Sequence, residues 1–400
     1  MPRTSREVVF VDGVRTPFGK AGEKGMYAQT RADDLVINCI RELMRRHPEL
    51  PPERVEEVAI AATTQIGDQG LTLGRMASLL SGLPNTTPGY SVDRMCAGAM
   101  TAVTNIAGAI SFGSIDVAVA GGVEHMGRHP MGEGVDPNPR VVAEKLVDPS
   151  ALVMGKTAEN LHDRYPTLTK ERSDEFAVNS QRKLAQAYED GKIQPDLVPT
   201  ATRHADKGWG LATADEPPRP QTTLESLKGL KTPFRPHGNV TAGNAAGLND
   251  GATACILAAE ETAHELGLPV GMRLVEFAFV GVEPEVMGYG PVPAAEKALA
   301  KAGDDERKRR KIVRKKAPEG RVNWTDKTFE RLRDAAPETL TSQFQVTTTM
   351  VLNLMERGGD PVAAMSDLLD RVGLWAPGFP GSTVPETAGR NTSGPRSPTR

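Results

Sequence analysis

Aromatic residues and cysteines are scarce in this sequence of 400 residues. Phe, Trp and Tyr make up 4% of the chain, whereas glycine occurs 40 times. The three cysteines, Cys39, Cys96 and Cys255, are odd in number and form no Cys-x-x-Cys pair. This pattern argues against a disulfide scaffold, indicates a reducing compartment and makes the cytoplasm the expected location. The many glycines are typical of a tightly turned α/β protein packed on small side chains.

Long apolar runs and an excess of one charge are also missing. The first residues, Met1 to Glu7, contain no apolar signal stretch, and no uninterrupted run approaches 18 apolar residues, so no membrane segment is expected. The 48 basic and 51 acidic residues give a net charge of −3. This near balance does not indicate a uniformly basic surface for nucleic acid, although a local basic patch stays open.

Apolar runs alternate with helical periodicity over the first 120 residues. Strands are predicted at Glu7–Val11, Val58–Ala62, Tyr90–Val92 and Asp116–Ala120. Helices are predicted at Asp33–Arg46, at Gly74–Leu83 and from Cys96 onward, where apolar residues recur every three or four positions. Because several of these strands are continuously apolar, we expect an α/β fold with a mainly parallel sheet that is covered on both faces. The length predicts two or three folded units.

The next part of the chain is less regular. Residues 127–247 contain proline-rich and polar connections and one clear helix, predicted at Ser173–Asp190 with Ser173 as its N-cap. We interpret this part as an insertion that carries recognition residues. After it, Ala252–Ala259 predicts a helix, Arg273–Val282 a strand that starts a second repeat, and Ala294–Lys301 the helix that follows.

The composition changes abruptly at Gly303. Eight of the thirteen residues from Asp304 to Lys316 are basic, and Phe329–Asp370 again has helical character. The tail after residue 370 is rich in proline and glycine and has few aliphatic residues, so we expect it to be disordered. The segment 304–370 is therefore predicted to be a basic, helical unit unrelated to the part before it.

Cys96 lies where a short strand turns into an apolar helix. A cysteine in such a segment is most often an inert core residue. At a strand-to-helix junction, however, free backbone N–H groups and the helix dipole stabilise a thiolate and donate to an oxyanion. Position alone leaves both interpretations open.

Six motifs in order resemble the thiolase family. They cover residues from about 7 to 303 and include the segment around Cys96, which resembles the acyl-accepting cysteine motif. The motifs are Asp12-Gly-Val-Arg-Thr-Pro-Phe-Gly19, Met95-Cys-Ala-Gly-Ala-Met100, Ala120-Gly-Gly-Val-Glu-His-Met126, Met154-Gly-Lys-Thr-Ala-Glu-Asn160, Thr241-Ala-Gly-Asn-Ala-Ala-Gly-Leu-Asn-Asp-Gly-Ala252 and Met287-Gly-Tyr-Gly-Pro-Val-Pro-Ala294. β-Ketoacyl synthases share the fold and a cysteine, but the long insertion with its Met154–Asn160 motif favours thiolase.

The resemblance implies a thiolase-like layered αβα core with an inserted loop domain. Residues 1–126 and 248–270 would form the N-terminal domain, 127–247 the coenzyme A-binding loop domain, and 271–303 the start of a C-terminal domain whose remainder is truncated and replaced. Cys96 would form the acyl thioester in acyl transfer between 3-ketoacyl-CoA or acyl-CoA and acetyl-CoA, as in fatty acid metabolism. The residues implied to bind substrate are Met154, Ala242, Gly243, Ala246 and Gly247.

The resemblance also sets expectations for ligands and partners. It implies coenzyme A thioesters as substrates, no further cofactor, no metal, and a homo-oligomer. Ala246 departs from the serine that many members carry in the coenzyme-binding turn, so a hydrogen bond to the pantetheine arm would be missing.

Two of the family's catalytic groups have no counterpart. The family uses a histidine in a Gly-His-Pro turn and a second cysteine in a Cys-x-Gly-Gly-Gly turn, both in its second half. Here no histidine follows His264 and no cysteine follows Cys255. We interpret His125 and His129 as surface loop histidines. Three acidic residues within the motifs, Glu124, Glu159 and Asp250, are expected to stabilise turns and cap helices.

Residues from Arg307 to about Met365 resemble no thiolase element. They look like an internal piece of a bacterial DEAD-like helicase protein, without a Walker motif. Three interpretations of the whole chain follow: a divergent thiolase with unrecognised catalytic groups, a chimeric or rearranged product without full turnover, and a nucleic-acid-binding fusion that acts through Arg307–Lys316. We favour the second for this polypeptide and a thiolase for its lineage.

Overall fold

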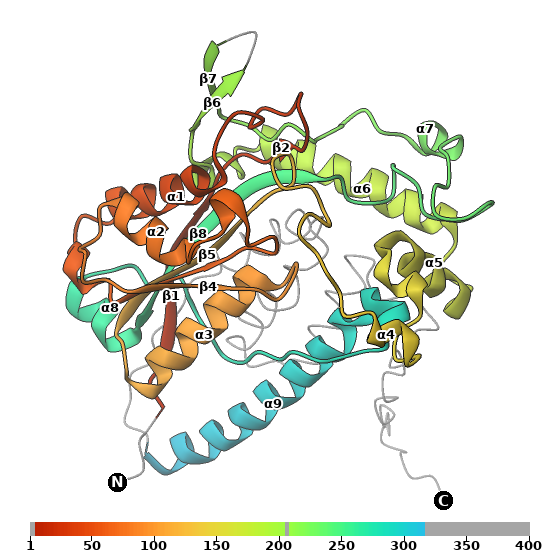
Figure 1. The fold of residues 1–400 in the computed structure, drawn as a ribbon. Helices are drawn as coiled ribbons and strands as arrows, with labels where there is room; N and C mark the ends of the chain where they lie inside the picture. Colours follow the sequence, from red (N-terminus) through yellow and green to blue (C-terminus); the bar gives the residue numbers. More distant parts are fainter. Residues whose placement is uncertain (1–4, 205–207, 317–400) are drawn as a thin grey trace, which may run out of the picture.

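The strands of the described chain form one mixed sheet and a separate hairpin (Figure 1). The computed structural model describes residues 5–204 and 208–316. The predicted helical character of 329–370 and the predicted disorder of 371–400 lie outside these residues. The strands are β1 (Val8–Arg15), β2 (Gly19–Lys20), β3 (Glu57–Ala61), β4 (Gly89–Val92), β5 (Val117–His125), β6 (Thr200–His204), β7 (Gly208–Ala212), β8 (Asn249–Ala259) and β9 (Met272–Arg273).

The α-helices include all those predicted from periodicity before the insertion. They are α1 (Ala32–Arg46), α2 (Leu73–Ser81), α3 (Gly98–Phe112), α4 (Arg140–Ala143), α5 (Met154–Arg164), α6 (Lys170–Glu189), α7 (Leu224–Lys228), α8 (Glu260–Leu266) and α9 (Pro291–Lys316). Five 3₁₀ turns, η1 (Pro52–Arg54), η2 (Gly67–Gln69), η3 (Pro149–Leu152), η4 (Gln194–Asp196) and η5 (Pro284–Tyr289), complete the helical elements of the described residues.

The sheet has the strand order β4-β3-β5-β8-β1-β9, with β2 paired to β8. Strands β4, β3 and β5 are parallel, whereas β8 runs antiparallel to both of its neighbours, β5 and β1. The expected α/β class is confirmed, but the sheet is mixed and not mainly parallel as predicted. The reason is β8, which enters the middle of the sheet from the opposite end.

The helix predicted at Ala252–Ala259 was wrong, because these residues form most of β8. Alternate residues of β8 belong to two different core clusters. Ile256 and Ala258 pack with α1, while Cys255 and Leu257 pack with α3. A strand covered on both faces needs apolar residues at every position, so its sequence carries no periodicity that separates it from a buried helix.

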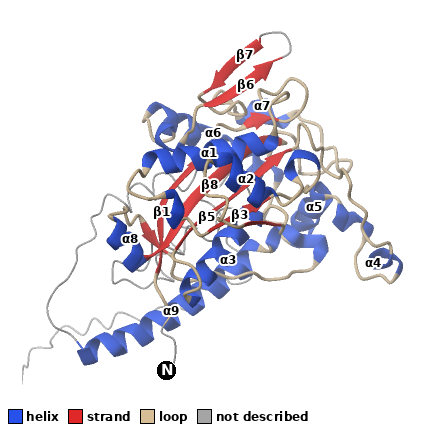
Figure 2. Ribbon diagram, turned by 60° about the vertical axis from the view of Figure 1, so that its left-hand side comes forward, coloured by secondary structure: helices blue, strands red, loops and turns tan. Residues whose placement is uncertain are grey.

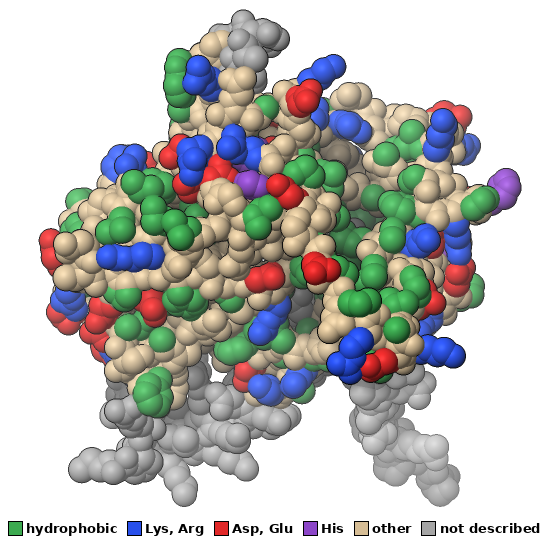
Figure 3. All heavy atoms as spheres, in the orientation of Figure 1, with side chains coloured by type: hydrophobic (Ala, Val, Ile, Leu, Met, Phe, Trp, Pro, Cys, Tyr) green, Lys and Arg blue, Asp and Glu red, His purple; other side chains and the backbone are tan. Residues whose placement is uncertain are grey.

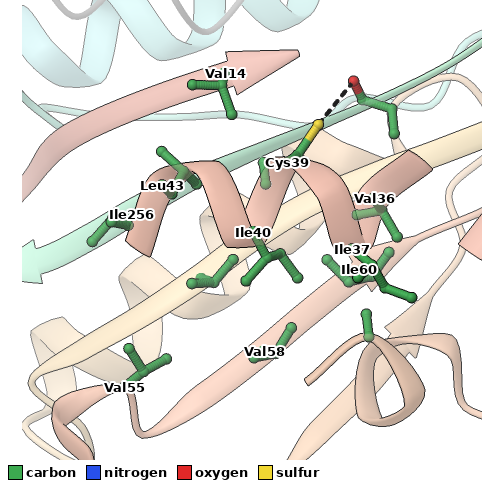
Figure 4. Close-up of a cluster of buried hydrophobic side chains, with 14 of the residues drawn as sticks. Val14, Val36, Ile37, Cys39, Ile40, Leu43, Val55, Val58, Ile60 and Ile256 are labelled. Carbon is green, nitrogen blue, oxygen red and sulfur yellow. Dashed lines mark hydrogen bonds between the residues drawn. The ribbon is translucent and has the colours of Figure 1, made fainter. Parts of the chain in front are cut away.

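Helices cover the two faces of the sheet separately (Figure 2). On one face, Val36, Ile37, Ile40 and Leu43 of α1 contact strand residues such as Ile60 (Figure 4). Each large aliphatic side chain buried in this way contributes about 1.5–3 kcal/mol. On the other face, Ile106 and Ile110 of α3 pack over β5 and β8.

Helix α3 bears on the expectation that the chain has no membrane segment. The window Met95–Phe112 is long and apolar enough to span a membrane by length and composition, because its polar residues are few rather than absent. The core helix of a protein outside membranes passes the same test. Its packing on β3, β5 and β8 shows that α3 serves here as a core helix.

The predicted second repeat contains a shorter strand than the sequence predicts. The strand expected at Arg273–Val282 is limited to β9, which pairs with β1 through only two residues. The helix expected at Ala294–Lys301 is confirmed, and α9 extends beyond it at both ends. Within the insertion, α6 begins at Lys170 and its N-cap is Thr169, which accepts a hydrogen bond from Arg172 N, rather than Ser173.

Candidate active site

The topology brings several candidate residues to one edge of the sheet. Parallel β3 and β4 end level with Gly122 of β5, since Ala61 pairs with both Val92 and Gly122, and β5 continues to His125. Cys96 follows β4 by four residues, and Glu124 lies two residues beyond Gly122. Because β8 is antiparallel, the Thr241–Leu248 loop that precedes it enters the sheet at this same edge. The antiparallel strand thus explains how a distant loop reaches the cysteine's side of the sheet.

The turn that carries Cys96 holds a strained backbone. Met95 has φ of 47°, in the left-handed region that costs a residue with a Cβ atom about 1–2 kcal/mol. Met95 N donates to Asp93 Oδ1 at 2.6 Å, and Gly98 N donates to Met95 O at 2.9 Å. The Arg94 guanidinium lies over the Phe279 ring, 3.9 Å from its centroid. This is the local geometry of a sharp strand-to-helix turn that presents the next side chain, Cys96, to solvent.

Small residues are required where α3 begins. A Cβ atom on Gly98 would lie 2.9 Å from Ala61 Cβ, and one on Gly122 would lie 3.0 Å from Ala99 Cβ. The start of α3 therefore packs directly against the ends of β3 and β5. This close approach fixes Cys96 relative to the strand ends.

The electrostatics of Cys96 correct one expectation. The helix N-terminus was expected to favour the thiolate, but partial burial, together with the nearby carboxylates of Glu124 and Asp93, raises the pKa of Cys96 above its usual value. Cys96 precedes the first residue of α3 by two positions, so its sulfur gains little from the helix dipole. The thiol, rather than the thiolate, is the resting form at neutral pH.

The other two cysteines are core residues. Cys39 and Cys255 are buried, and burial raises the pKa of each to about 12. Cys39 Sγ lies 3.6 Å from Ala252 O (Figure 4). Cys96 is therefore the accessible thiol of the described residues.

The interpretation of His125 and His129 as surface residues was wrong. His125 is completely buried, its Nε2 donates to Tyr27 O at 3.0 Å, and its Nδ1 accepts from Arg128 N at 3.1 Å. His129 Nε2 lies 2.6 Å from the buried carboxylate of Asp68. Both side chains fix the segment after β5 against this end of the sheet. The sequence of a loop alone does not reveal such hydrogen-bond partners.

The three acidic residues expected to be structural do hold loop segments in place, but none of them caps a helix of the described residues. Glu124 accepts hydrogen bonds from Thr63 N at 2.9 Å and from Gln69 Nε2 at 2.8 Å. Glu159 accepts from Asn239 N and Val240 N, and Asp250 accepts from Gly127 N at 2.8 Å. Burial raises the pKa of Asp250.

Helices α5 and α6 hold the loop that was predicted to bind substrate. Asn244 Nδ2 donates to Asp174 Oδ1 of α6 at 2.9 Å, while Asn244 Oδ1 accepts from Thr241 N at 2.8 Å. Gly243 lies close to two leucine side chains, since a Cβ atom at this position would lie 2.4 Å from Leu227 Cδ2 and 2.6 Å from Leu230 Cδ1. The three remaining residues predicted in this loop, Ala242, Ala246 and Gly247, are exposed.

Met154 is the first residue of α5 and is also exposed. A Cβ on the next residue, Gly155, would lie 2.2 Å from the Phe234 ring, so α5 is seated on the loop after α7. Figure 3 shows apolar side chains gathered over α4 and α5. The exposed apolar residues of this region include Met131, Leu146, Leu152 and Met154.

The sequence analysis missed two supports of the site. Gln69 is fully buried; its amide donates to Glu124, and its oxygen accepts from His125 N at 2.7 Å. Arg235 lies 3.0 Å from Glu159 and also pairs with Asp163. Neither residue lies in a motif that carries chemistry, so no sequence signal identifies them.

Comparison with known families decides the chain's relationship. Residues 8–261 match the family described as "Thiolase, N-terminal domain". The chain belongs to the thiolase family. The match includes Cys96, the insertion and β8, so the expected resemblance is confirmed for this part.

This chain aligns with individual thiolases over about three quarters of the length of each. The chain is 38% identical over 299 residues to the 3-ketoacyl-CoA thiolase of Aliivibrio fischeri, covering 74% of this chain and 76% of that protein. It is 41% identical over 305 residues to the 3-ketoacyl-CoA thiolase of Marinobacter nauticus, covering 76% and 77%. It is 39% identical over 313 residues to the 3-oxoadipyl-CoA/3-oxo-5,6-dehydrosuberyl-CoA thiolase of Escherichia coli, covering 74% and 77%.

The structural similarity has the same extent. Human mitochondrial 3-ketoacyl-CoA thiolase superposes with a TM-score of 0.66 at 30% identity, covering 75% of this chain and 77% of the human chain. Its complex with CoA gives a TM-score of 0.65 at 30% identity, covering 74% and 76%.

A different family begins where the thiolase similarity fades. Residues 294–373 match a domain of unknown function, DUF3516. This match begins at residue 294, before the change of composition at Gly303, and the predicted domain boundaries stay a prediction. The resemblance of this segment to a helicase protein stays a prediction.

Proposed function

We propose that Cys96 of this thiolase-family chain accepts an acyl group from a coenzyme A thioester. The observation that carries the proposal is the exposed Cys96 on its strained turn, at the sheet edge where the Thr241–Leu248 loop also arrives. Relatives named 3-ketoacyl-CoA thiolase and a related structure in complex with CoA support coenzyme A thioesters as the substrates.

In the proposed step, Sγ of Cys96 attacks the carbonyl carbon of the acyl thioester. The bond from that carbon to the sulfur of coenzyme A breaks, an acyl–Sγ bond forms, and the coenzyme A thiolate takes up the proton that Cys96 loses. The backbone N–H groups at the start of α3 are suitable donors to the carbonyl oxygen as it gains negative charge. The raised pKa of Cys96 makes this step slow at neutral pH, because the thiolate is the nucleophile.

The insertion supplies the surface for the coenzyme A part of the substrate in this proposal. Met154, Ala242, Gly243, Ala246 and Gly247 are the proposed contact residues. Support comes from the way α5 and α6 fix the Thr241–Leu248 loop through Glu159 and Asp174. Alanine at position 246 offers no hydroxyl group, so we propose weaker binding of the pantetheine arm than in members with serine there.

We further propose that the chain alone does not complete the carbon–carbon step. That step needs a base to remove the α-proton of acetyl-CoA and an acid to return it. The resemblance places these groups in a histidine and a second cysteine beyond residue 303, where the sequence contains neither. Because a positional error of about 1 Å costs roughly 10²-fold in rate, a chance substitute is improbable.

Two measurements on the purified chain test this function. Incubation with acetyl-CoA should add the mass of one acetyl group, mapped to Cys96 by peptide mass spectrometry, and should release an equal amount of coenzyme A. Cys96→Ala should abolish both, whereas Cys39→Ala should leave both intact. Absence of acylation at Cys96 in a folded chain would refute acyl acceptance.

The second measurement is thiolysis of 3-ketoacyl-CoA, monitored through the disappearance of that thioester. Its rate should stay at background. Turnover that disappears in Cys96→Ala would instead show that the chain is a complete, divergent enzyme. The two assays separate the acyl-accepting step from the missing carbon–carbon step.

A further inference from the structure

Asp250 carries a buried carboxyl group at the start of β8. Its side chain has no exposed surface, and its Oδ1 accepts a hydrogen bond from Gly127 N at 2.8 Å. Its Oδ2 has no hydrogen-bond partner within the described part of the chain. A Cβ atom on Gly127 would lie 2.7 Å from Oδ2, so the backbone after β5 packs directly against this oxygen. An ionised carboxylate in such a place is costly unless a cation pairs with it.

His125 of β5 faces Asp250 but does not supply that cation. Its Nδ1 lies 3.4 Å from Asp250 Oδ1. However, its Nε2 donates to Tyr27 O, and its Nδ1 accepts from Arg128 N. A histidine with a proton on Nε2 and a lone pair on Nδ1 is neutral. The pair therefore has the hydrogen-bond geometry of a neutral imidazole beside a carboxyl group that keeps its proton.

The other charged groups around this carboxyl group do not neutralise it either. In the segment after β5, Arg128 Nε and His129 Nε2 both contact the carboxylate of Asp68, at 2.9 and 2.6 Å. On β2, Lys20 is exposed. In the loop before α7, Glu216 adds a negative charge. Burial raises the pKa of the carboxyl group, and the charge of Glu216 acts in the same direction.

Asp250 also lies where the Thr241–Leu248 loop is attached to the sheet. Strand β2 lies against the start of β8, with Gly19 opposite Asp250 (Figure 1). Next to this pair, Ala21 N donates to the last carbonyl of the loop, that of Leu248, at 3.0 Å. The protonation state of one buried group is thus next to the hydrogen bonds that seat the loop.

We propose that Asp250 and His125 form a pH-sensitive switch that seats and releases the Thr241–Leu248 loop. In the seated state the carboxyl group carries a proton and the pair is neutral. At higher pH this proton passes to solvent, water enters to solvate the carboxylate, and the loop separates from Ala21. The switch goes beyond the acyl-accepting function and needs no chemistry at Cys96. Only its consequence for the binding of coenzyme A thioesters rests on the proposed function.

Infrared spectroscopy of the full chain detects the proton directly, through the C=O stretching band of a protonated carboxyl group. The difference between the wild-type chain and Asp250→Asn should contain this band well above pH 3.9, about where an exposed aspartate ionises. The band should disappear with one midpoint as pH rises. Asparagine keeps an oxygen for Gly127 N and carries no charge, so it mimics the protonated state. A difference spectrum without the band would overturn the proposal.

Hydrogen exchange tests whether the loop follows the proton. After correction for the intrinsic pH dependence of exchange, the amides of residues 241–250 should exchange at least about tenfold faster above the infrared midpoint than below it. In Asp250→Asn they should stay protected on both sides of that midpoint. Corrected exchange that does not change with pH, or that changes equally in Asp250→Asn, would overturn the switch.

Urea unfolding provides a third measurement, with Asp215→Asn as the matched control. The unfolding constant of the wild-type chain divided by that of Asp250→Asn should rise about tenfold per pH unit above about 3.9, up to the pKa of folded Asp250, because only the unfolded chain loses the proton there. Asp215 is paired with Arg15, so the corresponding ratio should fall as pH rises. A flat or falling ratio for Asp250→Asn, or its failure to fold, would overturn the proposal.

Discussion

At the scale of single residues, partial burial and two nearby carboxylates act together on the pKa of Cys96. Partial burial and the charges of Glu124 and Asp93 raise its pKa, and the expected benefit from the helix N-terminus does not compensate. Both carboxylates have backbone partners, since Asp93 accepts from Met95 N and Glu124 from Thr63 N. The groups that build the turn therefore also reduce the fraction of thiolate.

Alkylation with iodoacetamide measures this effect. Its rate at Cys96, mapped by mass spectrometry, should rise with pH to a midpoint above that of a free thiol, about 8.5. Asp93→Asn should move the midpoint to lower pH, because asparagine keeps an oxygen for Met95 N and removes the charge. Cys39 and Cys255 should react far more slowly.

Removal of a distant carboxylate, as in Glu225→Gln, is the control for this experiment. Glu225 lies on α7 and pairs with Lys228. An unchanged midpoint in Asp93→Asn, or an equal shift in Glu225→Gln, would contradict the assignment of the local charges.

At the scale of elements, the sequence predicted structure wherever one periodicity dominated. The helix at Asp33–Arg46 and the strand at Val58–Ala62 agree with α1 and β3 to within a residue. Ala252–Ala259 failed because burial on both faces removes periodicity, and the strand at Arg273–Val282 failed because strand propensity forms no ladder without neighbours.

In the candidate site, too, some features could be predicted from local sequence and others could not. Cys96 and the loop predicted to bind substrate are visible in local motifs, whereas the buried partners of His125 and His129 come from residues more than 50 positions away. Such partners depend on the packing of the whole sheet edge and leave no local pattern.

Glycine substitutions test the contact between β5 and β8. A Cβ on Gly121 would lie 2.3 Å from Thr253 O, so Gly121→Ala should lower the free energy of unfolding by about 1–3 kcal/mol or more. Gly108 of α3 has no atom within 4 Å of a built Cβ, and Gly108→Ala should raise stability by about 0.5–1 kcal/mol. Urea unfolding measures both, and equal effects would contradict this packing.

At the scale of the whole molecule, one ion pair joins the sheet to the insertion. The Arg15 guanidinium at the end of β1 donates to both oxygens of Asp215 at 2.7 and 2.8 Å. Asp215 also accepts from Phe18 N at 2.7 Å. Burial acts to raise the pKa of Asp215, but the hydrogen bonds and charge of Arg15 outweigh it, so this pKa lies below its usual range.

The stabilising contribution of this pair should depend on pH. Because the pKa of Asp215 is lower in the folded state, the contribution is complete above the unfolded value of about 3.9 and is lost as pH falls through the folded value. At neutral pH, Asp215→Asn should lower the free energy of unfolding by about 2–3 kcal/mol.

The exposed pair of Arg235 and Asp163 provides the comparison. Asp163→Asn should cost less than about 1 kcal/mol, because solvent screens that pair. Unfolding titrations at pH 7 and pH 3 measure both variants. A loss in Asp215→Asn that is as large at pH 3 as at pH 7 would contradict the ionic origin of the effect.

The central position of β8 has a consequence for how the chain is made. Strand β1 pairs with β8, and Ala252 N donates to Thr16 Oγ1 across 236 residues of sequence. At about 5–20 residues per second, the ribosome adds β8 some tens of seconds after β1. During this interval the first strand has no neighbour on that side, and β5 is likewise open. The sheet therefore cannot be completed until its middle strand has been synthesised. A chain released before residue 259 would expose the unpaired edges of β1 and β5, which are prone to aggregation.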